Sequence, residues 1–193
     1  MDFTKGYAYL FPISTLFEYS SAFVVFTLLC GQNAFSFELK EPFETPLGRK
    51  YETELKILIV PANQLPSGCR LTRETTGTAI FPATTNPFVT EDEKLIQFVS
   101  RFVVGEKQLD NVKAAFSVLF TDKEPRFEVG IWGLSFEDEK AASEALAQTK
   151  FGDVLVKDSL MLTVWHDTPD SKPCLRAIER HLKGEGFKKV QKG

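Results

Sequence analysis

The residues best able to carry out catalysis lie close together near the C-terminal end of the chain. His166 and Asp167 follow a run of apolar residues, and Cys174 comes shortly after them. A histidine held by a carboxylate can act as a general base, and a neighbouring cysteine can be its nucleophile. A His-Asp pair at the end of a strand is also an ordinary solvated turn. The pattern therefore leaves a hydrolase-like enzyme, using His166 with Asp167 or Cys174, as the less favoured interpretation.

Other catalytic and cofactor patterns are missing from the sequence. The two histidines, His166 and His181, do not stand at zinc-ligand spacing from each other or from a cysteine. The sequence contains no glycine-rich phosphate loop, nucleophile elbow or His-Glu-x-x-His motif. We therefore predict no metal site and no cofactor. The sequence leans towards a protein that is not an enzyme, without deciding the question.

Aromatic residues in the predicted strands indicate a binding surface instead. The alternation predicts that one face of the sheet carries four large side chains, Leu119, Trp132, Met161 and Trp165, together with Ser117 and Thr163. Large aromatic groups mixed with small hydroxyls are typical of a surface that binds a ligand or a protein. The alternative is that residues 61–89, or the first strand, simply cover this face.

Three cysteines bear on the compartment. Removal of an N-terminal signal peptide by cleavage after Ser36 would take away Cys30 and leave two cysteines. We therefore predict a Cys69–Cys174 disulfide formed in an oxidising compartment. The alternative is that both are buried free thiols, as in a cytosolic structural protein with an unusual N-terminal segment.

Residues 1–36 are predicted to be a signal peptide. Residues 19–37 carry no charge, and their most apolar part, Ala22 to Cys30, is shorter than the roughly 20 residues that a bilayer span needs. Ala34 and Ser36 place small residues at positions minus three and minus one of a cleavage site before Phe37. We therefore expect an exported protein, periplasmic or extracellular.

Two other interpretations of this segment stay open. A membrane anchor from Gly6 to Cys30 would have to bury the carboxylate of Glu18, which is costly. Leu28-Leu29-Cys30-Gly31 resembles a bacterial lipoprotein signal, although Leu29 stands where that signal has a small residue. In either case, only the N-terminal segment would attach the protein to a membrane.

The overall charge argues against one class of partner. The chain has 193 residues, with 23 Lys and Arg against 26 Asp and Glu, and its net charge is -3. Such a chain has no basic field to attract a phosphate backbone, so we predict no nucleic-acid partner.

The periodicity of apolar residues predicts one α+β domain over 52–184. It follows a linker or edge segment, 37–51, and precedes a basic flexible tail, 185–193. The expected strands are 55–60, 112–120, 127–131, 154–156 and 160–165. The expected helices are 91–104 capped by Thr90, 136–148 capped by Ser135, and 173–183, with a long loop over 61–89. The order implies a mainly antiparallel sheet of about five strands with two or three packed helices, and suggests a hairpin-plus-helix duplication.

Overall fold

The computed structural model describes residues 41–72, 83–105, 111–121, 127–149 and 153–191. The predicted signal segment, with Cys30, lies outside these ranges. Within them, no helix is both long enough and apolar enough to cross a membrane.

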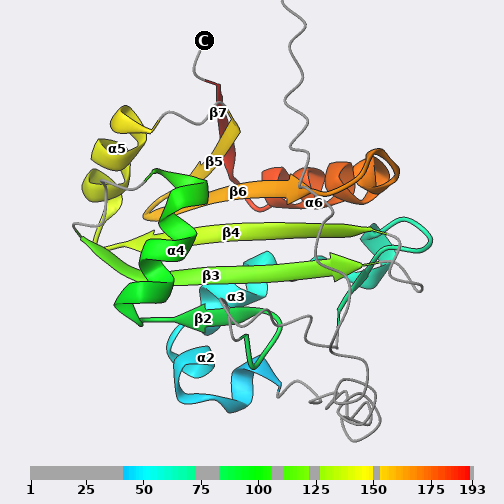
Figure 1. Ribbon diagram of the computed structural model, residues 1–193, viewed down its shortest axis with the longest axis horizontal. Coiled ribbons are helices and arrows are strands. Elements are labelled where there is room, and N and C mark those ends of the chain that lie inside the picture. The colour runs from blue at the N-terminus through cyan, green and yellow to red at the C-terminus, as the bar shows by residue number, and fades with distance from the viewer. Residues whose placement is uncertain (1–40, 73–82, 106–110, 122–126, 150–152, 192–193) are drawn as a thin grey trace, which may run out of the picture. The chain divides into compact units, whose positions relative to one another are not determined.

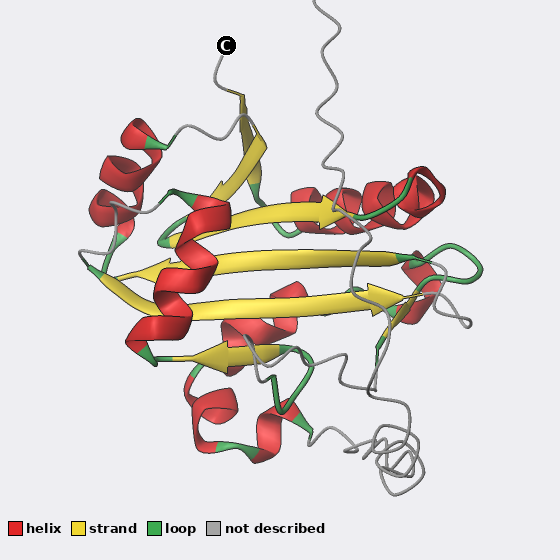
Figure 2. Ribbon diagram, viewed as in Figure 1, coloured by secondary structure: helices red, strands yellow, loops and turns green. Residues whose placement is uncertain are grey.

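The described residues form an antiparallel sheet of seven strands, as Figures 1 and 2 show. The strands are β1 (Arg70–Leu71), β2 (Phe88–Thr90), β3 (Val112–Thr121), β4 (Glu128–Phe136), β5 (Asp153–Lys157), β6 (Leu160–His166) and β7 (Lys188–Gln191). Their order is β1-β3-β4-β6-β5-β7, and β2 pairs with β3 beside β1. The predicted α+β class with a mainly antiparallel sheet is confirmed, and the sheet is wider than the expected five strands.

Helices cover both faces of this sheet (Figure 1). The α-helices are α2 (Pro46–Lys50), α3 (Glu52–Leu58), α4 (Glu93–Val103), α5 (Glu139–Gln148) and α6 (Lys172–Gly184), and the 3₁₀ turns are η1 (Pro42–Glu44), η2 (Ala62–Gln64) and η3 (Pro169–Ser171). The helices α3 and α6 pack with Phe116, Phe120 and Ile131 on one face. The helices α4 and α5 pack with Leu134 and Met161 on the other. The two hairpin-plus-helix units thus place their helices, α5 and α6, on opposite faces.

The prediction of a first strand over residues 55–60 is wrong, because residues 52–58 form helix α3. The side chains of Leu55 and Leu58 are both fully buried in the same core cluster. Residues three apart share a helix face but point to opposite faces of a strand. Glu52 and Lys56 add an ion pair at the i, i+4 spacing of a helix. The run of β-branched residues that suggested a strand is therefore overridden by tertiary burial.

The expected helix caps lie in strands, and the true caps come a few residues later. Thr90 is the last residue of β2, and the carboxylate of Asp92 accepts hydrogen bonds from the backbone N–H groups of Lys94 and Leu95, at 3.0 and 3.1 Å. Ser135 lies within β4, and Asp138 caps α5. Strand pairing keeps the earlier residues extended, so the helices begin only beyond the strand ends.

Residues at both ends of the domain have regular structure. Residues 42–50, expected as a linker, form η1 and α2. The basic segment expected as a flexible tail contains β7, which pairs with β5. Phe187 anchors the turn before β7 in the core, and Lys189 contacts Asp153 and Glu179 at 3.3 and 3.4 Å. Burial works against the charged ammonium, but these two carboxylates outweigh it and raise the pKa of Lys189.

The side chain of Asn86 completes the sheet where β1 and β2 approach β3. Its Nδ2 donates to the carbonyl oxygens of Thr72 and Leu119, both at 2.8 Å, and its Oδ1 accepts from Leu119 N at 3.0 Å. We expect Asn86→Ala to lower the free energy of unfolding by about 1–3 kcal/mol, because the part-buried backbone N–H of Leu119 and carbonyl oxygen of Thr72 lose this partner. Urea unfolding measures the loss. Asn63→Ala, at an exposed site, is the control, and equal stability of the two variants would contradict this role.

Candidate functional site

All four residues of the predicted binding face lie on one face of the sheet. Trp132 pairs with Ser117 on one side and with Thr163 on the other, and Gly130 pairs with Leu119 and Trp165. Met161 pairs with Leu134. Residues that are directly opposite in an antiparallel ladder share a face, and so do every second residues of a strand. The side chains therefore gather on the face that also carries α4.

This face divides into a buried part and a half-buried part. Helix α4 crosses β3, β4 and β6 over their left-hand halves in Figure 1. Met161 is fully buried in the same cluster as Ile96 and Val99 of α4. Met161 is therefore a core residue of this face. The other part of the face holds half-buried residues, namely Ser117, Leu119, Trp132, Thr163 and Trp165.

Four rings form a continuous series on this face, which we call the aromatic strip: Phe98, Phe102, Trp132 and Trp165. The ring centroids of Phe102 and Trp132 lie 5.7 Å apart with 19° between the planes. Those of Trp132 and Trp165 lie 6.2 Å apart with 21° between the planes. Phe98 meets both Phe102 and Trp132 edge to face.

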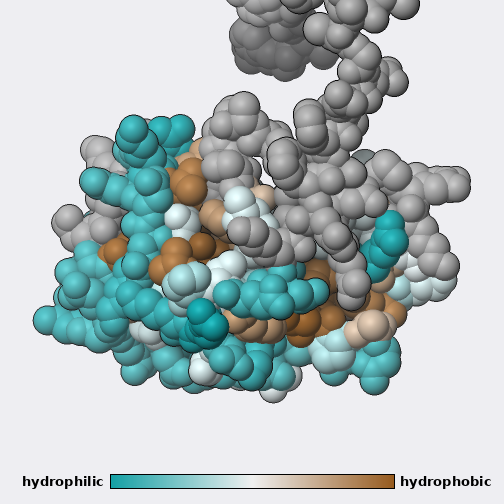
Figure 3. Space-filling model, turned by 90° about the horizontal axis from the view of Figure 1, so that it is seen from below, coloured by the Kyte–Doolittle hydropathy of each residue, from teal (hydrophilic) through white to brown (hydrophobic). Residues whose placement is uncertain are grey.

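Phe98 and Phe102 come from helix α4, and Phe102 is 41% exposed, the highest value among large hydrophobic residues of the described part. Apolar residues interrupt the hydrophilic surface of the described part in Figure 3. The i, i+4 spacing of the two phenylalanines could have indicated their contact, but it could not show that they continue a row on the sheet.

Gly130 allows Trp165 to lie against the sheet. A Cβ atom on Gly130 would stand 2.3–2.4 Å from Cε2, Cζ2 and Nε1 of the Trp165 indole. The ring therefore covers the glycine.

We expect Gly130→Ala to displace the indole and to destabilise the fold by about 1–3 kcal/mol, as overpacking does. Near-UV circular dichroism should lose the signal of the tryptophan pair. Gly184→Ala is the matched control, because a Cβ atom there meets nothing within 4 Å. An unchanged tryptophan signal in Gly130→Ala would contradict the placement of the ring.

Three buried polar atoms near the end of β6 have no hydrogen-bond partner. They are Oγ1 of Thr163, Nε1 of Trp165 and Oγ1 of Thr168, and they are the only such side-chain atoms in the described ranges. A buried polar group without a partner costs about 1–3 kcal/mol. Among the described residues, the buried side-chain atoms that lack a hydrogen-bond partner thus all belong to residues 163–168.

An acidic pair stands at the end of the strip next to Trp165. Glu128 lies at the start of β4, and the backbone N–H of Asp167 donates to its carbonyl oxygen at 3.2 Å. Alternation puts Glu128 and Asp167 on the same face as Trp132 and Trp165. Burial, and then the charge of Asp167, raise the pKa of Glu128.

This shift predicts a pH-dependent gain for Glu128→Gln. A raised pKa in the folded state means that ionisation of Glu128 costs stability as pH rises through that pKa. The variant should therefore have a higher Tm than wild type at pH 7, and the difference should shrink as pH falls below the ordinary value of 4.5. Calorimetry at pH 7 and at a pH below 4.5 tests this prediction. Glu144→Gln, at an exposed site, should show no such trend, and a constant difference for Glu128→Gln would contradict the shift.

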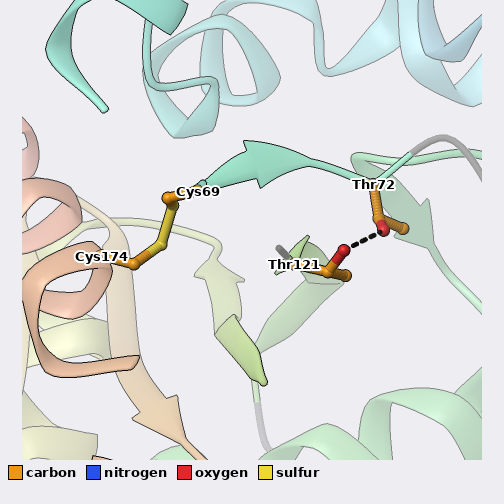
Figure 4. Close-up of a disulfide and its surroundings, with 4 residues drawn as sticks. All are labelled: Cys69, Thr72, Thr121 and Cys174. Atoms are coloured by element: carbon orange, nitrogen blue, oxygen red, sulfur yellow. Dashed lines mark hydrogen bonds between the residues drawn. A yellow bond between two sulfur atoms is a disulfide. The ribbon is translucent and has the colours of Figure 1, made fainter. Parts of the chain in front are cut away.

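The three candidate catalytic residues have separate local roles. His166 is exposed, and its Nδ1 lies 2.9 Å from the carbonyl oxygen of Thr168. Asp167 is exposed beside Glu128. Cys174 is 1% exposed and is bonded through its Sγ to Cys69 (Figure 4), so in this state it offers no thiol nucleophile.

Two cavities lie away from the strip. One, of about 480 Å³, is lined in part by Lys50, Tyr51 and Glu91. The Glu91 carboxylate accepts hydrogen bonds from Lys50 Nζ at 2.5 Å and from Tyr51 Oη at 2.7 Å. These bonds lower the pKa of Glu91, while burial and the bond to Glu91 raise that of Tyr51. The side chains of Lys50, Tyr51 and Glu91 thus satisfy one another.

The other cavity, of about 440 Å³, adjoins His181. The ring nitrogens of His181 lie 3.0 Å from Gln64 Oε1 and 3.0 Å from the carbonyl oxygen of Ile57. His181 therefore ties α6 to η2 and to α3. Sequence reasoning missed both cavities because their lining residues come from distant segments.

Neither a metal-ligand cluster in the described residues nor a similarity to a known protein assigns a function to this chain. The described ranges contain no group of three or more His, Cys, Asp or Glu side chains that could hold a metal ion. Comparison of the chain with protein-family models, curated proteins and solved structures finds no match.

Proposed function

We propose that this protein is a small exported domain that binds a ligand or a partner protein on the aromatic strip and is not an enzyme. The observation that carries the proposal is the row of nearly parallel rings, exposed at Phe102 and half-buried at Trp132 and Trp165, on a sheet face whose other half is closed by α4. Aromatic residues that keep part of their surface exposed retain a large favourable energy of burial for a partner.

The disulfide supports the export part of the proposal. Cys69 and Cys174 are bonded, with Cα atoms 5.7 Å apart. Disulfides form and persist in oxidising compartments and are rare in the cytosol. The uncharged segment of residues 19–37 agrees with this placement.

Binding can be tested with the protein's own tryptophans, because Trp132 and Trp165 are the only two in the chain. The panel contains neutral oligosaccharides, a proline-rich peptide, a lysine-rich peptide and a long-chain fatty acid. We expect at least one class to change the tryptophan emission in a saturable way. Calorimetric titration should show that Trp165→Ala weakens this binding about tenfold or more.

The control is Phe43→Ala, which removes a half-buried ring packed on the opposite core. This variant should bind like wild type. Circular dichroism confirms that each variant is folded, and Trp165→Phe keeps a ring in place should Trp165→Ala unfold. If no class binds, or if binding is indifferent to the strip variants, the proposed function is wrong.

Export is tested by the intact mass of the protein made in an export-competent host. We expect a chain that begins at Phe37, with Cys69 and Cys174 taking up an alkylating agent only after reduction. A full-length chain with three freely alkylated thiols would contradict export.

A further inference from the structure

The cavity of about 480 Å³ is lined by residues from α2, α3 and the start of β3. Its volume falls within the roughly 300–1,000 Å³ of small-molecule sites. Its lining includes the buried Tyr51 and four charged side chains, those of Lys50, Glu54, Glu91 and Lys113. Tyr51 belongs to the core cluster of the α3 and α6 face, whereas the aromatic strip lies on the α4 face. The cavity is therefore separate from the strip.

Glu54 is the carboxylate of this cavity that lacks a cation. Lys50 and Glu91 pair with each other. Glu54 is half-buried and forms no ion pair with another residue of the described ranges. Its carboxylate lies near the Tyr51 hydroxyl, because its charge, after burial and the bond and charge of Glu91, helps to raise the pKa of Tyr51. A half-buried carboxylate without a partner favours a ligand that brings an ammonium group.

A bulge in β3 directs Lys113 to the same cavity. The register of β3 on β4 shifts between Val112 and Ala114. Val112 packs with the α4 cluster and Ala114 with the α3 cluster, although residues two apart in a regular strand share a face. The extra residue, Lys113, is thereby re-aimed to the side of Tyr51 and lines the cavity. Its Nζ donates to the carbonyl oxygen of Glu137 at 2.9 Å, and no carboxylate of the described part pairs with it.

These two charges of opposite sign restrict the ligand. An anion would meet Lys113 but would be repelled by Glu54 and Glu91. A cation would meet Glu54 but would be repelled by Lys113 and Lys50. An uncharged ligand would leave the half-buried carboxylate of Glu54 without a cation. A ligand that carries both an ammonium and a carboxylate group matches both charges.

We infer that this cavity binds a small zwitterion, an amino acid or a dipeptide, whose ammonium group pairs with Glu54 and whose carboxylate pairs with Lys113. The inference is independent of the proposed function, which concerns the aromatic strip. Glu54 is half-buried and Lys113 is exposed, and an ion pair is stronger where water screens it less. The ammonium group of the ligand should therefore contribute more affinity than its carboxylate.

The experiment titrates the full chain with L-leucine, L-phenylalanine and leucyl-leucine by calorimetry. We expect at least one to bind saturably, with a Kd of about 1 mM or tighter, as suits a ligand of so few atoms. The dipeptide holds its two charges further apart than the amino acids do, so the relative affinities identify which of the two the cavity takes.

Derivatives of each probe remove one charge at a time. The N-acetyl derivative keeps only the carboxylate and should bind about tenfold or more weakly than its parent. The C-terminal amide keeps only the ammonium group and should bind about 2–5-fold more weakly, because the ion pair of an exposed lysine is worth little.

Variants of the cavity test the two contacts. Glu54→Gln should weaken binding of the zwitterion about tenfold or more, and Lys113→Gln by about 2–5-fold. Glu54→Gln should leave the affinity of the N-acetyl derivative unchanged, and Lys113→Gln that of the amide, which a merely structural role would not predict. Glu52→Gln and Lys140→Gln are the matched controls, because neither side chain lines the cavity, and both should bind like wild type.

Three outcomes would overturn the inference. It is wrong if none of the three probes binds. It is also wrong if the amide binds as tightly as its parent and Lys113→Gln has no effect, since the cavity would then take an amine alone. Binding that Trp165→Ala abolishes and Glu54→Gln leaves intact would place the ligand on the strip, which contradicts this inference and supports the proposed function.

Discussion

Replacement of both Cys69 and Cys174 by alanine should lower the free energy of unfolding by about 4–5 kcal/mol. The bond joins the residue before β1 to helix α6 across a sequence separation of 105 residues (Figure 4). It thereby removes a large part of the conformational freedom of the unfolded chain. Alanine is the suitable replacement because both sites are buried among apolar residues. The measurement is urea unfolding of the oxidised wild type and of the double variant.

Reduction of the wild type is the matched control for this prediction. A reductant should bring the stability of wild type close to that of the double variant, and it should leave the double variant itself unchanged. A double variant as stable as the oxidised wild type would show that the bond contributes nothing to folding.

Leu58→Ala should destabilise the protein by about 2–5 kcal/mol, the second large effect. The Leu58 side chain is fully buried against the core of the α3 and α6 face, and its removal leaves a cavity that closely packed neighbours cannot fill. The measurement is again the unfolding midpoint in urea.

Ile57→Ala tests the helical conformation of the same segment. Ile57 is half-buried, so its truncation should cost clearly less than that of Leu58. Leu55→Ala should resemble Leu58→Ala, because a helix puts both leucines on one face. In a strand, Leu55 and Ile57 would share a face instead. Equal, large losses for Leu55 and Ile57 with little loss for Leu58 would contradict helix α3.

Part of the candidate site followed from the sequence alone. Period-two alternation placed Trp132 and Trp165 on one sheet face, and strand pairing in the structure puts them in contact. The same alternation could not show where α4 would cross the sheet, and that crossing makes Met161 a core residue and leaves the tryptophans half-buried. The outcome depends on packing between segments far apart in the chain.

The sequence by itself determined the elements whose signals are local: the two long hairpins, the amphipathic helices α4 and α6, and the α+β class. Helix and strand periodicities are properties of neighbouring residues, so they can be recognised in the sequence without knowledge of the fold. Tertiary structure decided the conformation of Leu55 to Val60, the pairing of β7 with β5, and the row that Phe102 forms with Trp132 and Trp165. A short apolar run suits either a helix or a strand, and only the surface against which it is buried selects between them.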